Sequence, residues 1–411
     1  MHFFTSATAN YIPKARILAK TLKAHNPDCF FSLGLSDNLP DGFDLGAEPF
    51  DEVIFTDYLP CFRDNNVFFF KHNVTEICTA VKPALALDII NRHNADKVVY
   101  LDPDIVVFDA FSEISKLLDR YSMIFTPHQT VPEKERNFII GNEVLFLKRG
   151  IYNLGFFAVK ADNTGIEFLK WWHERLKYFC MDDKEYTINN VINKLGLKGL
   201  FTDQKWIDMV PAYFDNYYIL KKPGYNVSTW NLTRHSLQES NGNYFVDGYP
   251  LIFFHFSGFD SKEHHLVLNN VIAYNHFCSD AKKLSNWYEK ELTKEGQKEL
   301  GSIEWKYSRY SNNEIIPNVH RKILNIRIDV HPKFPDPFLV TDGFCFYTWV
   351  KDEYGKYLSE EQNETRAAQN KNYKLRVLFN NTINFFFPYN TKRREFARSI
   401  KRFLKKIKGD W

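Results

Sequence analysis

The chain has 411 residues, of which 44% are hydrophobic and 17% aromatic, and its formal net charge is +3. This length allows two or three domains with ample core, and the small net charge argues against nucleic acid as a partner. The six cysteines are scattered without a C-x-x-C pair, so the sequence signals neither a cysteine zinc site nor a disulfide framework.

The first hundred residues alternate strands and helices. Hydrophobic periodicity predicts strands over 2–5, 30–35, 52–55 and 97–101, and helices over 11–25 and 83–91. This β-α-β order predicts an α/β fold with a mostly parallel sheet flanked by helices. Ligands of such sheets bind beyond the carboxyl ends of the strands, where this chain has Thr5, Asp37 and Asp102.

The later sequence changes character at about residue 281. Residues 150–280 contain a predicted aromatic helix at 166–179 and a strand at 251–256. A charged helix at 282–300 follows, and then strand-like pieces at 338–350 and 375–387. We therefore expect a larger N-terminal domain over 1–280, a smaller C-terminal α+β module of unknown role over 281–390, and a terminal helix over 391–411.

The terminal helix is basic and amphipathic. Its apolar residues share one stripe: Phe396, Ile400, Phe403, Leu404 and Ile407. Nine lysines and arginines surround the stripe, against one glutamate. Such a helix can lie in an anionic membrane interface, although an ordinary docked surface helix shows the same stripe. No run reaches the roughly 18 apolar residues of a membrane span, and the N-terminus lacks a signal-peptide pattern. We expect a cytoplasmic protein held peripherally on the inner face of the membrane.

The most informative stretch is residues 98–108, VVYLDPDIVVF. Two aspartates, Asp102 and Asp104, interrupt an apolar run of buried-strand character, with Pro103 between them. Buried carboxylates are paired, protonated or bound to metal. Oxygen ligands suit Mg²⁺ or Mn²⁺, which water and substrate phosphates usually complete. The pair therefore predicts a metal–diphosphate site. The chain has neither G-x-G-x-x-G nor G-x-x-x-x-G-K, which counts against a dehydrogenase or an ATPase.

Seven short motifs occur in a recognisable order. They are Thr5-Ser6-Ala7, Lys82-Pro83, residues 100–104 (YLDPD), 152–156 (YNLGF), 203–206 (DQKW), 230–232 (WNL) and 255–259 (HFSGF). This order resembles bacterial glycosyltransferases of the GT-A (Rossmann-like) fold, in particular the retaining lipopolysaccharide galactosyl- and glucosyltransferases and glycogenin. The resemblance covers about residues 1–275.

The resemblance implies a site for a nucleotide-diphosphate sugar, with a UDP-sugar favoured. The donor would be contacted by Thr5, Ser6, Ala7, Asp37, Lys82, Asp102, Pro103, Asp104, Asn153, Gly155, Gly258 and Lys262. Lys82 precedes Pro83, which suits a first helical turn, so its amine could reach a phosphate. Asn153 and Gly155 would form a tight loop against the sugar. The related families carry a lysine where this chain has Ser261, and Lys262 follows directly.

The resemblance also implies the metal ligands and the reacting residues. Asp102, Asp104 and His255 would bind Mn²⁺ or Mg²⁺. Asp203 and Gln204 would lie near the anomeric carbon, where positioning and electrostatic stabilisation supply most of the acceleration. The acceptor would meet Tyr152, Trp230 and Asn231, whereas Trp171 and Trp172 have helical core spacing.

These features predict a metal-dependent hexosyltransferase that acts with retention on a surface glycan or a lipid-linked glycan. Two alternatives stay open. A nucleotidyltransferase that makes sugar nucleotides shares the carboxylates but normally has a glycine-rich loop after its first strand, which residues 5–11 lack. A non-catalytic, membrane-docked glycan-binding protein would have a degenerate site.

Overall fold

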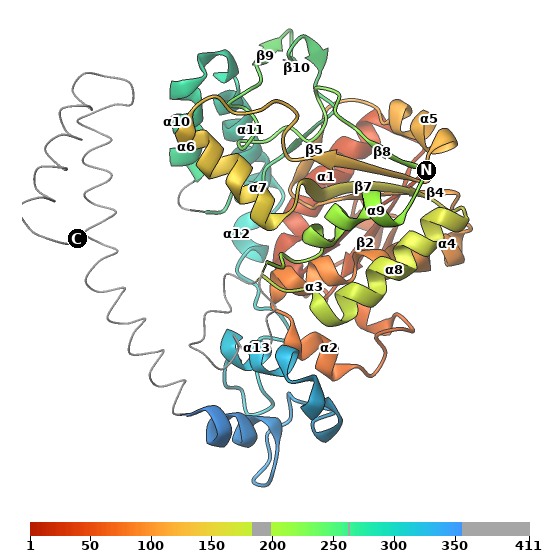
Figure 1. Cartoon of the computed structure of the whole chain (residues 1–411), viewed down its shortest axis with the longest axis vertical. Coiled ribbons are helices and arrows are strands. Elements are labelled where there is room, and N and C mark those ends of the chain that lie inside the picture. The colour runs from red at the N-terminus through yellow and green to blue at the C-terminus, as the bar shows by residue number, and fades with distance from the viewer. Residues whose placement is uncertain (183–198, 262–263, 356–411) are drawn as a thin grey trace, which may run out of the picture. The chain divides into compact units, whose positions relative to one another are not determined.

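The computed structural model describes residues 1–182, 199–261 and 264–355. Its centre is a seven-stranded sheet in the order β3-β2-β1-β4-β7-β6-β8 (Figure 1). The strands are β1 (His2–Ala7), β2 (Phe30–Leu35), β3 (Glu52–Phe55), β4 (Lys97–Leu101), β6 (Met123–Pro127), β7 (Tyr152–Lys160) and β8 (Tyr217–Ile219). Only β7 runs antiparallel to its neighbours β4 and β6. The predicted mostly parallel sheet is thus confirmed.

Helices cover both faces of this sheet. One face carries α3 (Val74–Ala80), α4 (Lys82–His93) and α8 (Asn163–Phe179), and the other carries α1 (Ile12–His25) and α5 (Ser112–Arg120). Local signals explain where these helices begin. Asn73 and Glu76 form a capping box at the start of α3, and Pro83 occupies the first turn of α4.

The side chains of strand β4 contribute to the hydrophobic clusters on both faces of the sheet. Val98 and Tyr100 pack with α4 and α8, whereas Val99 and Leu101 pack with α1 and α5. Because side chains alternate across a strand and both faces are covered, β4 is apolar throughout. Because both faces of β4 are buried, carboxylates are unfavourable within the strand, and the two aspartates come only after it ends.

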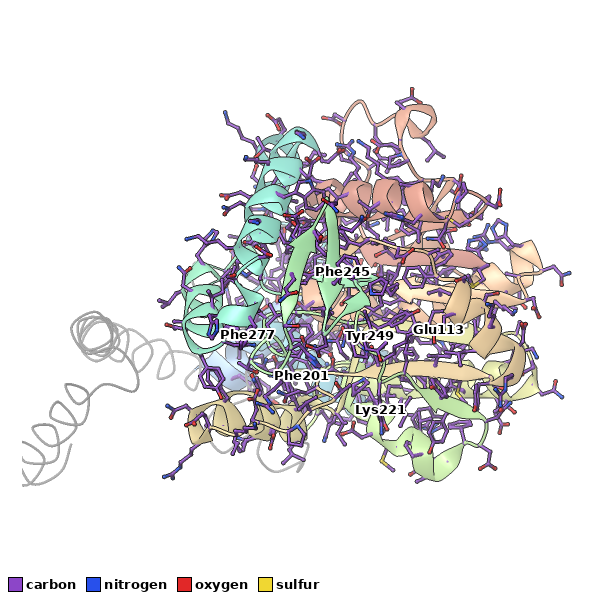
Figure 2. The ribbon with its side chains drawn as sticks, turned by 90° about the horizontal axis from the view of Figure 1, so that it is seen from above. Glu113, Phe201, Lys221, Phe245, Tyr249 and Phe277 are labelled. Carbon is purple, nitrogen blue, oxygen red and sulfur yellow. The ribbon has the colours of Figure 1, made fainter. Side chains whose placement is uncertain are left out.

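Two smaller sheets flank the large one. Strand β5 (Ile105–Val107) pairs antiparallel with β12 (Phe253–His255). The strands β9 (Leu237–Ser240), β10 (Asn243–Val246) and β11 (Tyr249–Pro250) form a meander, which bears the labelled Phe245 and Tyr249 in Figure 2.

The remaining helices are short or peripheral. They are α2 (Asn66–Lys71), α6 (Arg136–Phe138), α7 (Val144–Arg149), α9 (Val210–Tyr213), α10 (His264–Tyr274), α11 (Ala281–Lys294), α12 (Gln297–Leu300) and α13 (Asn318–Ile326). Single turns of other helix types are η1 (Ala9–Tyr11), η2 (Leu45–Ala47), η3 (Thr56–Tyr58), η4 (Ile139–Glu143), η7 (Gln204–Met209), η8 (His276–Cys278) and η9 (Ile328–Lys333). Within the described ranges, no helix is both long and apolar enough to cross a lipid bilayer.

Two sequence predictions need correction. The single helix expected over 282–300 is divided between α11 and α12, because Gly296 adopts a left-handed conformation with φ of +89°. No strand forms between residues 338 and 347, where the chain makes turns and begins a helix at Phe346. The alternation there reflects aromatic packing, since Phe338 and Phe346 both contact Phe70.

The described residues form two compact units with a boundary at residues 347/348. Residues 281–347 belong to the same unit as the large sheet. The division of the chain into functional modules at 280/281 and 390/391 stays a prediction. The expected strand over 375–387 and the helix over 391–411 lie outside the described residues.

Truncating a core leucine tests the importance of the α5 face. Leu118 on α5 is fully buried, so Leu118→Ala removes apolar contacts and leaves a cavity. We expect the free energy of unfolding to fall by about 2–5 kcal/mol. Leu45, which is 39% exposed, is the matched control, and Leu45→Ala is expected to change stability far less. Urea denaturation followed by circular dichroism measures both, and equal losses would contradict this packing.

Candidate active site

The two aspartates of the DPD motif lie where β4 gives way to β5. Asp102 directly follows β4, and Asp104 directly precedes β5. The backbone fixes the turn at both ends, since Asp102 N–H donates to Gly155 O (2.8 Å) and Phe256 N–H donates to Asp104 O (2.9 Å). These carboxylates are therefore held by the main chain of neighbouring strands.

The third predicted ligand reaches the same place through strand pairing. In the β5–β12 ladder His255 lies opposite Ile105, one residue after Asp104. His255 Nε2 is 3.0 Å from Asp104 Oδ1 and 3.6 Å from Asp102 Oδ2. One ligand atom from each residue lies within 4.8 Å of the others. Two carboxylates and an imidazole fit a divalent cation, and the partly exposed aspartates (26% and 14%) leave room for substrate oxygens.

Without a metal ion, attraction between the carboxylates and their positively charged neighbours stabilises this cluster. Burial acts to lower the pKa of His255, but Asp104 and Asp102 outweigh it and raise the pKa above its usual value. Burial likewise acts to raise the pKa of Asp104, and the neighbouring His255 and Lys14 outweigh it and lower that pKa. A divalent cation at this site would take the place of the His255 proton as the positive partner of the two carboxylates.

Asn153 and Gly155 orient the histidine. They lie within strand β7, so the loop predicted for them is wrong. Asn153 Oδ1 is 3.2 Å from His255 Nδ1, which leaves Nε2 directed at the aspartates. A Cβ atom on Gly155 would collide with the His255 ring, so only glycine lets β7 pass so close. The signal for this role was the glycine itself.

Lys82 is the cation on the other side of Asp102. It is the first residue of α4, and its side chain is 2% exposed. Its Nζ lies 3.0 Å from Asp203 Oδ2 and 3.4 Å from Asp102 Oδ1, and it donates to Leu154 O (2.9 Å). Burial acts to lower the pKa of Lys82, but Asp102 and Asp203 raise it, so the amine is charged. The structure thus brings Lys82, Asp102 and Asp203 together.

Asp203 and Gln204 are adjacent in the sequence, but their side chains make different contacts. Burial raises the pKa of Asp203 even though Lys82 opposes that shift. The Thr202 hydroxyl donates to Asp203 Oδ1 (3.1 Å). Gln204 holds the 149–154 segment, because its Nε2 donates to Arg149 O (2.9 Å) and its Oε1 accepts from Leu154 N–H (3.4 Å). Trp172 donates to Asp203 O and is fully buried, as its spacing predicted.

The predicted nucleoside contacts lie at the ends of β1 and β2. Thr5, Ser6 and Ala7 are buried, and the Thr5 hydroxyl has no hydrogen-bond partner among the residues that the structure describes. Asp37 is also buried, and its carboxylate accepts three backbone amides, from Ala9 (3.1 Å), Asn38 (2.9 Å) and Lys306 (3.0 Å). Its position therefore organises the strand ends, and donor binding by these residues stays a prediction.

Two of the three predicted acceptor residues, Trp230 and Asn231, contact His128. The Trp230 ring lies edge-on to His255, 5.3 Å away, and its Nε1 donates to His128 O (2.9 Å). Asn231 donates to the same carbonyl and to Asn226 O. Tyr152 packs on Phe125 in the core. Two predicted donor-binding residues remain. Gly258 follows β12 with a backbone φ of +70°, and Lys262 lies outside the described residues.

Sequence reasoning missed one pair near the metal ligands. Lys14 of α1 is buried and forms an ion pair with Asp260, five residues after His255. The only signal was a lysine one helical turn before the buried Leu18, on the apolar side of α1.

A second group of potential metal ligands is His2, Glu52 and His93. It lies at the opposite ends of the strands from the aspartates, since His2 begins β1 and Glu52 begins β3. Glu52 Oε1 accepts from the Ser32 hydroxyl (2.5 Å), and Oε2 is 3.0 Å from Arg92. Its oxygens are thus already engaged, as expected of a polar network.

No family model matches the chain. Two curated proteins of Bacillus subtilis (strain 168) resemble it, and both are described as uncharacterized. YfnF is 30% identical over 194 residues, which cover 45% of this chain and 57% of that protein. YfnD is 24% identical over 264 residues, which cover 63% of this chain and 78% of that protein. The chain thus spans little more than half the length of the first relative.

The solved structures that the chain resembles include several glycosyltransferases. The galactosyltransferase LgtC, in complex with donor and acceptor sugar analogues, is 15% identical, covers 74% of this chain and 98% of its own, and gives a TM-score of 0.38. WbbM, a bifunctional glycosyltransferase, is 12% identical over 72% of this chain and 51% of its own (TM-score 0.36). Mouse xyloside xylosyltransferase 1 is 13% identical over 62% and 97% (TM-score 0.35).

Replacing Gly155 tests the support of His255. Gly155→Ala pushes the imidazole away from the aspartates, and we expect Mn²⁺ affinity to fall by about tenfold or more. Gly141 is the control, because a Cβ atom there meets no other atom within 4 Å and Gly141→Ala leaves the site untouched. Titration calorimetry with Mn²⁺ measures both variants. Unchanged affinity in Gly155→Ala would show that β7 does not orient the histidine.

Proposed function

We propose that this chain is a metal-dependent GT-A glycosyltransferase, which transfers a hexose from a nucleoside diphosphate sugar to a glycan or lipid-linked glycan with retention. The convergence of Asp102, Asp104 and His255 beside the buried cation of Lys82 carries the proposal. A nucleoside diphosphate is a leaving group that needs positive charge, and this cluster offers both metal ligands and an ammonium group.

The three ligands would hold Mn²⁺ or Mg²⁺, which when bound would neutralise the diphosphate. Lys82 stays charged through its contacts with Asp102 and Asp203 and would stabilise negative charge developing on the leaving phosphate. Asp203 lies on the far side of Lys82 and would face the positive charge that develops on the sugar ring. Gln204 would position the 149–154 segment beside that sugar.

The two alternatives are less well supported. A nucleotidyltransferase would need phosphate-binding backbone after β1, and residues 5–11 contain no glycine. A non-catalytic glycan-binding protein has no need to keep a buried lysine between two aspartates, because burying unneeded charge is costly. Asp203 and Lys82 are 3% and 2% exposed, which favours catalysis.

Nucleotide binding tests the proposal. A ligand at a hundred times its Kd stabilises the fold by about 2.7 kcal/mol, so one of UDP, GDP, ADP, CDP or dTDP is expected to raise the Tm in the presence of Mn²⁺. Asp104→Asn removes a ligand and is expected to abolish the metal-dependent part of this shift. Asp28→Asn, at an exposed position, is the matched control. No shift with any nucleotide would contradict the donor class.

The terminal segment gives a second proposal, which rests on sequence. Residues 391–411 would hold the enzyme on the inner face of an anionic membrane, where a lipid-linked acceptor would lie. Deleting them is expected to abolish co-sedimentation with phosphatidylglycerol vesicles and to leave the Mn²⁺-dependent nucleotide shift intact. Phosphatidylcholine vesicles are the control for charge. Undiminished binding by the shortened chain would place the attachment elsewhere.

A further inference from the structure

Lys14 is a buried cation that the proposed mechanism does not yet use. It lies in the first turn of α1, and its side chain is only 1% exposed. Its ammonium group pairs with Asp260 and lies 3.9 Å from the centre of the Tyr11 ring. Burial alone would favour the neutral amine, but Asp104, followed by Tyr11 and Asp260, raises the pKa of Lys14. Lys14 is therefore positively charged in its pair with Asp260.

Its partner is much less constrained. Asp260 is 48% exposed and lies in the turn that leaves β12, between Gly258 and the last residue described before position 262. Two backbone hydrogen bonds stabilise the turn: Phe259 N–H donates to Phe256 O, and Ser261 N–H donates to Gly258 O. The Asp260 carboxylate itself can rotate into water, whereas the Lys14 ammonium cannot.

The two buried lysines approach the DPD motif from opposite sides. Lys82 from α4 contacts Asp102, whereas Lys14 lies on α1, which packs on β5, the strand that Asp104 directly precedes. The chain contributes a further polar group on the Lys14 side. Tyr288 of α11 is fully buried, and its hydroxyl has no hydrogen-bond partner within the described part of the chain. The Tyr288 ring stacks on Phe256, the residue after His255, with ring centroids 3.9 Å apart, and lies edge-on to Phe259, the residue before Asp260, at 4.9 Å.

We propose that Lys14 binds the diphosphate of the donor, and that the Asp260 carboxylate pairs with the Lys14 ammonium only while no donor is bound. This inference rests on the proposed function. When a nucleoside diphosphate enters, a phosphate oxygen replaces the Asp260 carboxylate on the Lys14 ammonium, and Asp260 turns into solvent. The lysine expected on the diphosphate from sequence, Lys262, lies outside the described residues, so its role stays a prediction beside that of Lys14.

Exchange between anions explains why a lysine is tolerated at this buried position. A buried ammonium without a partner is strongly destabilising, whereas one that passes from carboxylate to phosphate is paired in both states. The released Asp260 carboxylate is hydrated at little cost because it is already half exposed. Asp260 would then compete with the donor, and removing its charge should favour donor binding.

Two substitutions with opposite expected effects test the exchange. Lys14→Met keeps an unbranched side chain, one atom shorter, and removes the charge, and we expect it to weaken UDP binding in the presence of Mn²⁺ by about tenfold or more. The affinity for UMP, which lacks the second phosphate, is expected to fall much less in the same variant. Asp260→Asn removes the competitor and is expected to tighten UDP and inorganic pyrophosphate. Lys20→Met is the control, since Lys20 lies on the same helix, 54% exposed and paired with Glu295.

Titration calorimetry with UDP, UMP and pyrophosphate, each with Mn²⁺, separates the outcomes. If Lys14→Met binds UDP as the wild type does, the inference is wrong and the proposed function stands. If Asp260→Asn weakens UDP binding as much as Lys14→Met, the pair only positions the turn after β12. If Lys14→Met unfolds, the exposed Asp260→Asn variant decides by the sign of its effect. If the wild type binds none of the five nucleoside diphosphates with Mn²⁺, both proposals fail.

Discussion

Negative charge gathered at the end of β4 is the constraint on which the rest of this structure depends. Asp102, Asp104 and Asp203 lie close together where the environment is largely apolar, and carboxylates in such a place need positive partners. The chain supplies them from separate elements, with Lys82 from α4 and His255 from β12. The elements that surround the site must therefore converge on one point, and the topology is the means by which they do so.

The main chain gives this cluster its rigidity. The turn that holds the aspartates is bonded to β7 on one side and to the residue after β12 on the other. Asn153 then fixes the ring of His255 from within β7. Sites built on strands with a supporting shell are held more precisely than sites on loops. Catalysis by positioning and electrostatics, as we propose here, requires such fixed groups because they must not reorganise as charge develops.

Part of the large sheet was predictable because its signals are local, whereas β6, β7 and β8 were not predicted as strands. Strands β1 to β4 and helices α1, α4 and α8 show the expected periodicities, and Pro83 marks the start of α4. The DPD motif was readable because carboxylates interrupt an apolar run. The Lys14–Asp260 pair was not, because it joins the first helix to a turn far along the chain. The break at Gly296 was also missed, since a single glycine in a helical pattern is often tolerated.

The segment after residue 281 illustrates what a resemblance limited to residues 1–275 leaves out. Trp305 Nε1 donates to Ser36 O (2.8 Å), and Lys306 N–H donates to Asp37, so this segment closes over the end of β2.

The same segment also reaches Asp57, which accepts from the Lys306 amine (2.8 Å) and the Tyr307 hydroxyl (3.2 Å). Helix α11 packs on α1, and its Tyr288 ring stacks on Phe256, the residue after His255. The hydrogen bonds of residues 305–307 hold them against the segments that follow β2 and β3. Under the proposed function the nucleoside would rest on these strand ends, so substitutions in residues 305–307 would alter donor binding through the backbone that they hold.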